Sequence, residues 1–290
     1  MSRLLAGEGA LRRALCEGRI TPAFQPIIRA PGKVLHGVEV LARWYQPDGS
    51  VVTPDSFIPQ VVRSGLEPAL IRSLMKQAVP TVRALAAATG HPVVVGFNAG
   101  PTCLMNPEFA GICEDFLTAC GDTGAGLAVE VTEREPLHPK LVPALDRLRT
   151  AGVRLVLDDY GTGYAMEQVL SWLRPDVVKI DRSLTALAGE GDPEGLLARN
   201  FDVLRRYSVT VLAEGVETRA EYRWLRARGI RLFQGWFTGR PMTSEALLAS
   251  LRSGTLDKSG KNNGIPDAEN RGQLSYTKWL GKGANRNWLH

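Results

Sequence analysis

Short apolar runs rich in Val, Ile and Leu recur along the chain, and longer stretches with helical periodicity separate most of them. The short runs predict strands at residues 22–29, 34–44, 92–98, 126–132, 153–159, 176–181, 208–215 and 230–236. The longer stretches predict helices at residues 3–18, 55–64, 67–89, 107–119, 139–151, 164–173, 193–207 and 218–228. Nearly continuous apolar strands that alternate with helices are typical of a parallel sheet covered on both faces.

The first two predicted strands are separated only by Ala30-Pro31-Gly32-Lys33. So short a turn permits an antiparallel hairpin but no parallel crossover. From the second strand onward the order is strand then helix, repeated. We therefore expect an α/β fold, a modified TIM (β/α)8 barrel with one antiparallel strand. The alternative, an open doubly wound sheet, lacks the expected glycine-rich phosphate turn after the first strand.

The pattern divides the chain into three segments. Residues 1–20 are expected to form a short N-terminal helical segment, and residues 21–256 the barrel. Residues 257–290 are rich in Lys, Asn and Gly without sustained periodicity, which predicts disorder or loose packing. This tail could bind a partner through Trp279, Leu280, Trp288 and Leu289, but an incidental extension is the favoured interpretation.

Composition narrows the function. The net charge is +5, and residues 257–290 carry six basic and three acidic side chains, so the predicted barrel is close to neutral. This distribution gives little support to a surface for a nucleic-acid polymer. The four cysteines form no metal-binding or disulfide pattern and are expected to be reduced. Neither a signal peptide nor a membrane span is recognisable, so we expect a cytoplasmic protein without membrane insertion.

Acidic and amide residues stand at the C-terminal ends of the predicted strands. In a barrel these ends share one rim, which is where active sites lie. Carboxylates gathered there would repel one another unless cations held them together. Histidines are few and scattered, so hard cations such as Mg²⁺ or Mn²⁺ fit better than zinc. The residues concerned are Glu39, Asn98, Glu130, Asp158, Asp159, Asp181 and Glu214.

Asp158 and Asp159 form an adjacent acidic pair at one strand end. Neighbouring strand residues face opposite ways, so both can face the rim only where the strand breaks into its loop. We expect Gly161 and Gly163 to supply that break. With one acid bridging, a two-metal centre could form, with ions roughly 3.5–4 Å apart. Alternatively the pair only caps the next helix, which would be favoured if the other acids were absent.

Lys179 lies two residues before Asp181, on the same face of an apolar strand. An unpaired buried ammonium is costly, so acidic neighbours are required. Beside metal ions Lys179 could polarise an attacking water. The alternative is a structural ion pair between Lys179 and Asp181.

Several motifs in fixed order resemble the EAL domain of cyclic di-GMP phosphodiesterases, from about Thr21 to Met242. The ordered series is far more specific than any one motif. The motifs are Phe24-Gln25-Pro26-Ile27, Glu39-Val40-Leu41-Ala42-Arg43-Trp44, Asn98, Glu130-Val131-Thr132-Glu133, Asp158-Asp159-Tyr160-Gly161-Thr162-Gly163-Tyr164, Lys179-Ile180-Asp181, Ala213-Glu214-Gly215-Val216-Glu217-Thr218 and Gln234-Gly235-Trp236.

This resemblance implies roles for individual residues. Lys179 would assist the attacking water, and Asp158 would bridge the ions and join Glu39 and Lys179 as the catalytic residues. Glu217 would fix the loop after Asp159. The ligands of two Mg²⁺ or Mn²⁺ ions would be Glu39, Asn98, Glu130, Asp158, Asp159 and Glu214. The substrate contacts would be Gln25, Leu41, Arg43 and Gln234, with Arg43 on a phosphate.

The resemblance predicts a phosphodiesterase that linearises cyclic di-GMP to 5′-pGpG, and a homodimer. One alternative is a catalytically silent member that binds cyclic di-GMP or a protein partner, although no predicted ligand is missing. A second alternative, independent of the family, is a barrel enzyme that uses Lys179 for a Schiff base or for proton abstraction. The number of acids fits that chemistry poorly.

Overall fold

A computed structural model describes residues 8–31, 33–132, 137–161, 166–192 and 194–256 of the 290-residue chain. The tail 257–290 and the predicted break at Gly163 lie outside these residues. No helix in the described part of the chain is both long enough and apolar enough to cross a membrane.

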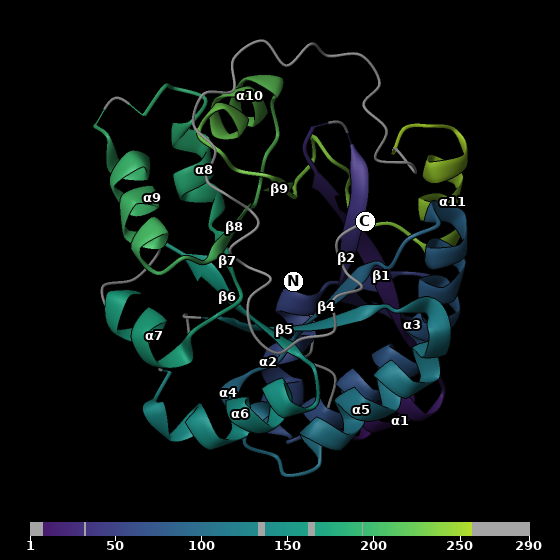
Figure 1. The fold of residues 1–290 in the computed structure, drawn as a ribbon. Helices are drawn as coiled ribbons and strands as arrows, with labels where there is room; N and C mark the ends of the chain where they lie inside the picture. The colour runs from purple at the N-terminus through teal and green to yellow at the C-terminus, as the bar shows by residue number, and fades with distance from the viewer. Residues whose placement is uncertain (1–7, 32, 133–136, 162–165, 193, 257–290) are drawn as a thin grey trace, which may run out of the picture.

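The strands form a closed barrel, as the sequence predicts (Figure 1). Strand β1 is antiparallel to both of its neighbours, β2 and β9, and its pairing with β2 closes the ring. The other neighbouring strands of the ring are parallel. The barrel strands are β1 (Ile20–Arg29), β2 (Val34–Tyr45), β4 (Val94–Asn98), β5 (Gly126–Thr132), β6 (Arg154–Tyr160), β7 (Val177–Ile180), β8 (Thr210–Ala213) and β9 (Leu232–Phe233).

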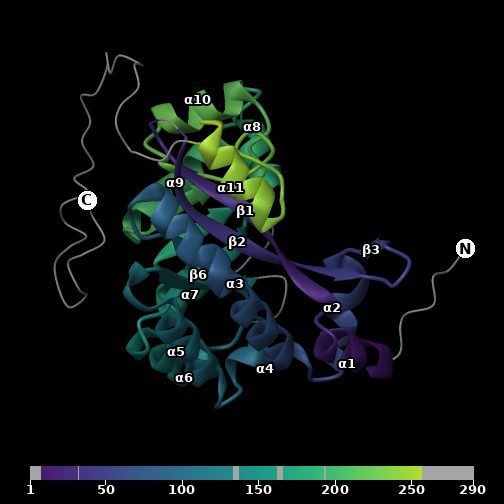
Figure 2. The same cartoon turned by 90° about the vertical axis from the view of Figure 1, so that its right-hand side faces the viewer.

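Helices cover the outside of the barrel, and Figure 2 shows α3 and α11 lying against β1. The helices are α1 (Glu8–Cys16), α2 (Pro54–Arg63), α3 (Glu67–Thr89), α4 (Pro101–Leu104), α5 (Phe109–Cys120), α6 (Val142–Thr150), α7 (Met166–Leu173), α8 (Arg182–Leu187), α9 (Leu196–Arg206), α10 (Arg219–Ala227) and α11 (Ser244–Arg252). Two 3-10 turns, η1 (Gly121–Thr123) and η2 (Pro139–Leu141), precede β5 and α6.

Short elements differ most from the prediction. The strand predicted at residues 230–236 shrinks to β9, because the following residues turn across the rim. Strand β3 (Val51–Val52) is an extra strand paired antiparallel with β2, and α4, α8 and α11 were also not predicted. Two to nine residues give too few turns of periodicity to stand out in a sequence.

The apolar core is continuous from the barrel to the first helix. Leu11 and Ala14 of α1 are fully buried in it, as is Ile20, with which β1 begins. The N-terminal helix therefore packs onto the barrel. All four cysteines are free thiols, and only Cys16 is exposed.

Basic groups gather at the end of the barrel where the parallel strands begin, opposite the acidic rim. Arg29 at the end of β1 donates to Nδ1 of His36 in β2 at 2.6 Å. Burial, the positive charges of Arg29 and Arg154 and the proximity of His91 together lower the pKa of His36 to about 3, and burial is the largest cause. His36 is therefore neutral in the folded protein.

This depressed pKa predicts a loss of stability in acid. An unfolded histidine binds a proton below about pH 6.5, whereas the folded protein resists protonation down to about pH 3. Between these values the unfolded state binds more protons, so the free energy of unfolding falls as the pH falls. We expect His36→Gln to flatten this dependence in urea titrations between about pH 6.5 and pH 4.5. Identical slopes for both proteins would contradict the assignment.

Candidate active site

The predicted site residues converge at the carboxyl ends of the strands. Asn98 pairs in register with Glu130, and Thr132, two residues further along β5, pairs with Asp158, so neighbouring strands deliver these side chains to the same end of the barrel. Glu39 in β2 lies opposite Gly96 of β4. Glu214 and Gln234 directly follow β8 and β9. Strand pairing thus assembles the site from residues far apart in the sequence.

The ammonium group of Lys179 lies at the centre of this acidic group. Its Nζ is 2.5 Å from Glu130 Oε2, 2.6 Å from Glu214 Oε1, and 3.3 Å from both Glu39 Oε2 and Asp158 Oδ1. Lys179 is only 1% exposed. The acidic neighbours that a buried lysine requires are present, and all four are predicted metal ligands.

Glu39 is fixed by two amide side chains as well as by Lys179. Asn98 Nδ2 donates to Glu39 Oε1 at 2.8 Å, and Gln234 Nε2 donates to Glu39 Oε2 at 2.6 Å. Because each amide donates through its nitrogen, its oxygen can serve as a ligand or an acceptor. In the part of the chain that the structure describes, the buried Oε1 of Gln234 has no hydrogen-bond partner. Gln234 therefore offers an acceptor at the site.

The side chain of Glu130 fits into the cluster only because residue 96, on the adjacent strand β4, is a glycine. A Cβ atom on Gly96 would lie 2.1 Å from Glu130 Oε1, which is far inside contact distance. The absence of a side chain at this position lets Glu130 point across the sheet to Lys179.

One ammonium group cannot balance the charge of four carboxylates. The pKa values of the four acids therefore shift in different directions. Burial opposes ionisation of Glu39, but Lys179 and the hydrogen bonds from Gln234 and Asn98 outweigh it and lower the pKa. Burial and the charge of Glu39 raise the pKa of Glu130 to about 8. Burial likewise raises the pKa of both Asp158 and Glu214. Despite its burial, the surrounding carboxylates raise the pKa of Lys179, so it stays charged.

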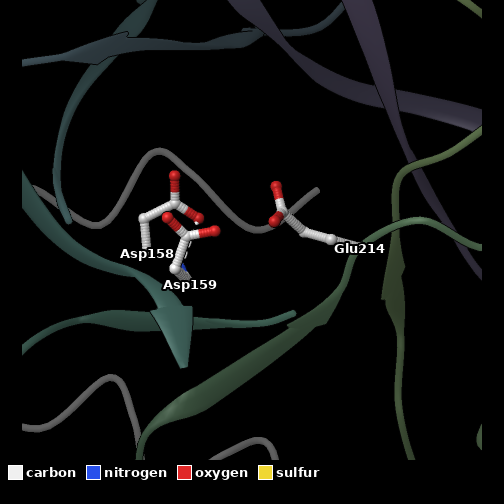
Figure 3. A group of neighbouring side chains, drawn as sticks. All are labelled: Asp158, Asp159 and Glu214. Atoms are coloured by element: carbon white, nitrogen blue, oxygen red, sulfur yellow. Dashed lines mark hydrogen bonds between the residues drawn. The ribbon is translucent and has the colours of Figure 1, made fainter. Parts of the chain in front are cut away.

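Asp158, Asp159 and Glu214 form a tighter acidic group on the open side of this cluster. Carboxylate oxygens from the three lie within 4.8 Å of one another. Figure 3 shows the two aspartates at the end of β6 facing Glu214 across from them. Oxygen donors this close suit a hard divalent cation.

The backbone of Asp159 explains how adjacent aspartates reach the same side. Its φ is +58°, in the left-handed region, and the pairing of β6 with β7 is irregular between Leu157 and Tyr160. Its N–H donates to Asp158 Oδ1 at 2.9 Å. The strand thus has an additional irregularity at Asp159, before it ends at Tyr160 and Gly161 follows with a φ of +111° at the predicted break.

A cavity of about 350 Å³ opens beside the acids. Its lining includes the predicted substrate residues Gln25, Leu41 and Gln234, together with Glu39, Asp158, Lys179, Glu214 and Glu217. Arg43 is not among the lining residues of the described chain; its Nη1 donates to the carbonyl of Ala42 at 2.8 Å. The phosphate contact of Arg43 therefore stays a prediction.

Asp181 and Glu217 make contacts that differ from those predicted from the sequence. Asp181 caps α8, accepting from Ser183 N at 2.7 Å, so the alternative of a Lys179–Asp181 ion pair is wrong. Glu217 accepts from Arg182 at 2.8 Å, and the loop that it was predicted to hold lies outside the described residues.

Asp181, one of the acids predicted at the rim, also lines the cavity, as do Arg182 and Trp236, to which the sequence reasoning gave no role. The place of Trp236 at the cavity could have been predicted, because it directly follows Gln234-Gly235 in a motif already recognised in the sequence.

A model of the EAL domain family matches residues 8–241. The chain belongs to this family. It is 37% identical over 240 residues to the probable cyclic di-GMP phosphodiesterase PdeG of Escherichia coli (strain K12), covering 81% of this chain and 47% of PdeG. It is 30% identical to the cyclic di-GMP phosphodiesterase PdeL of the same organism, covering 83% of this chain and 67% of PdeL.

Solved EAL structures share the barrel. The PaMucR phosphodiesterase in complex with c-di-GMP superposes with a TM-score of 0.72 at 27% identity, over 82% of this chain and 97% of that one. Because this EAL chain spans about half the length of PdeG, the similarity concerns the domain and not the whole relative.

Proposed function

We propose that this EAL domain is a metal-dependent phosphodiesterase that hydrolyses one phosphodiester bond of cyclic di-GMP to give linear 5′-pGpG. The observation that carries the proposal is the complete acidic cluster around Lys179, open to a cavity lined by Gln25, Leu41 and Gln234. The similarity to proteins named cyclic di-GMP phosphodiesterases supports the choice of substrate.

The donor set fits two Mg²⁺ or Mn²⁺ ions. Asp158, Asp159 and Glu214 supply clustered carboxylate oxygens, and Glu39, Asn98 and Glu130 add further oxygen donors around Lys179. Such ions would activate the attacking water and neutralise charge on the phosphoryl group. We assign these six residues as the ligands.

The chain's own groups prepare the site in other ways. Lys179 keeps its proton and contributes positive charge where negative charge develops on a phosphoryl group. Asn98 and Gln234 hold Glu39 in one orientation. The unpartnered Oε1 of Gln234 can accept a hydrogen bond from water or from the substrate. Together these contacts fix the reacting groups before the substrate binds.

The proposal is tested by metal-dependent turnover. Purified protein with Mn²⁺ or Mg²⁺ should convert cyclic di-GMP to 5′-pGpG, resolved by liquid chromatography. Excess EDTA should abolish turnover, and restored Mn²⁺ should recover it. Cyclic di-AMP serves as the matched control substrate. If the folded protein gave no product with either metal, the proposed phosphodiesterase activity would be refuted. Tight binding of cyclic di-GMP without turnover would identify a catalytically silent receptor. The homodimer and the cytoplasmic location stay predictions.

A further inference from the structure

Trp236 is a large apolar side chain placed in the open at the edge of the cavity. It is 53% exposed. Of the exposed large apolar side chains in the described part of the chain, only Trp236 lines the cavity. Leaving an indole in water forgoes the free energy that its burial would provide. A ligand that covers the ring would recover that free energy.

The backbone holds Trp236 firmly despite this exposure. Gly235 adopts a φ of +147°, and a Cβ atom there would lie 2.3 Å from both the N and O atoms of Val216. On either side, Val216 N donates to Gln234 O at 3.0 Å, and Phe237 N donates to Val216 O at 2.9 Å. The segment carrying the indole is therefore locked against the segment that follows Glu214.

Two guanidinium groups adjoin the indole. Arg240 lies 4.1 Å and Arg182 lies 5.7 Å from the ring centroid. Arg182 is also held by Glu217 at 2.8 Å. Cation–π contacts stabilise the position of the ring. The arginines also place positive charge beside the aromatic surface, and Arg182 lines the cavity, whose other charged residues are acidic except for Lys179.

We propose that Trp236, supported by Arg182 and Arg240, is the stacking platform for one guanine base of the cyclic dinucleotide. This inference rests on the proposed function and adds a specificity-determining residue to it. A flat aromatic ring stacks on a nucleobase, and adjacent arginines favour the phosphates to which that base is joined. Continuity with the acidic cluster favours this ligand over a protein partner, because the same molecule can reach both the platform and the acids.

The first test separates the platform from catalysis. With Mn²⁺ and cyclic di-GMP, Trp236→Ala should raise KM at least about tenfold and change kcat less than about threefold, while Trp236→Phe should keep KM within about threefold of the parent. Trp224→Phe is the matched control, because Trp224 of α10 also contacts an arginine, with the guanidinium of Arg228 3.3 Å from its ring centroid, and does not line the cavity. An unchanged KM for Trp236→Ala would overturn the proposal.

The second test follows binding without hydrolysis. In an Asp158→Asn background with Mn²⁺, cyclic di-GMP should quench tryptophan fluorescence. Adding Trp236→Phe should remove the quenching, and adding Trp224→Phe should preserve it. Quenching that persists without Trp236 would overturn the platform, as would failure of both the parent and the background to bind the nucleotide. Binding with quenching but no turnover by the parent would instead refute only the proposed hydrolysis. If Trp236→Phe changed association with a protein partner and left nucleotide binding unchanged, Trp236 would belong to a protein interaction surface. That result would overturn the stacking platform.

Discussion

Replacing Lys179 by methionine should remove nearly all phosphodiesterase activity and destabilise the metal-free protein. The side chain is fully buried among four carboxylates, and methionine keeps much of its volume without the charge. Removing one partner of a buried charge cluster costs about 3–5 kcal/mol. In EDTA the melting temperature should therefore fall by roughly 10 °C, at about 2–4 °C per kcal/mol for a chain of this size.

Divalent ions should reverse much of this destabilisation, because added cations replace the missing positive charge and bind only the folded state. The rate with saturating Mn²⁺ should still fall by about 10²–10⁴-fold, since metal cannot supply the positioned ammonium group. The exposed Lys76 of α3 gives a matched control, and Lys76→Met should leave both measurements unchanged. A Lys179→Met protein with wild-type melting in EDTA would show that the ammonium does not stabilise the cluster.

The barrel was predictable because its signals are long or repeated. The β1–β2 hairpin follows from a four-residue separation, and α3 occupies the predicted range 67–89 because its helical period continues over many turns. The strand ends placed the acids on one rim without any knowledge of contacts. That step needed only the shared direction of parallel strands.

The detailed contacts could not be read from the sequence. Sequence reasoning placed Lys179 near acids but could not show that four carboxylates would surround it. Nor could it place the additional irregularity of β6 at Asp159, because left-handed backbone at a non-glycine residue is uncommon and depends on the surrounding structure. The roles of Gly96 and Gly235 likewise emerge only when strands distant in sequence lie against each other.

Replacing Asp158 by asparagine should remove most of the activity without destabilising the fold. Asp158 lines the cavity, lies 3.3 Å from Lys179 and belongs to the group with Asp159 and Glu214. Loss of its charge should lower kcat with Mn²⁺ by roughly a thousandfold, as expected when a preorganised electrostatic contact is lost. The exposed Asp146 of α6 provides the same substitution as a control, and Asp146→Asn should retain full activity.

Asp158→Asn should nevertheless melt at the wild-type temperature or above it in EDTA, because burial raises the pKa of Asp158 in the folded state. A carboxyl group with a raised folded-state pKa stabilises the fold when protonated, and this stability is lost as the pH rises through that pKa. Once it is ionised above that pKa, Asp158 thus opposes folding, whereas Lys179 keeps three other carboxylate partners. The melting temperature of the wild type in EDTA should fall more steeply from pH 5 to pH 8 than that of Asp158→Asn. A variant several degrees less stable at pH 8, or one with normal turnover, would mean that this aspartate serves the fold and not the chemistry.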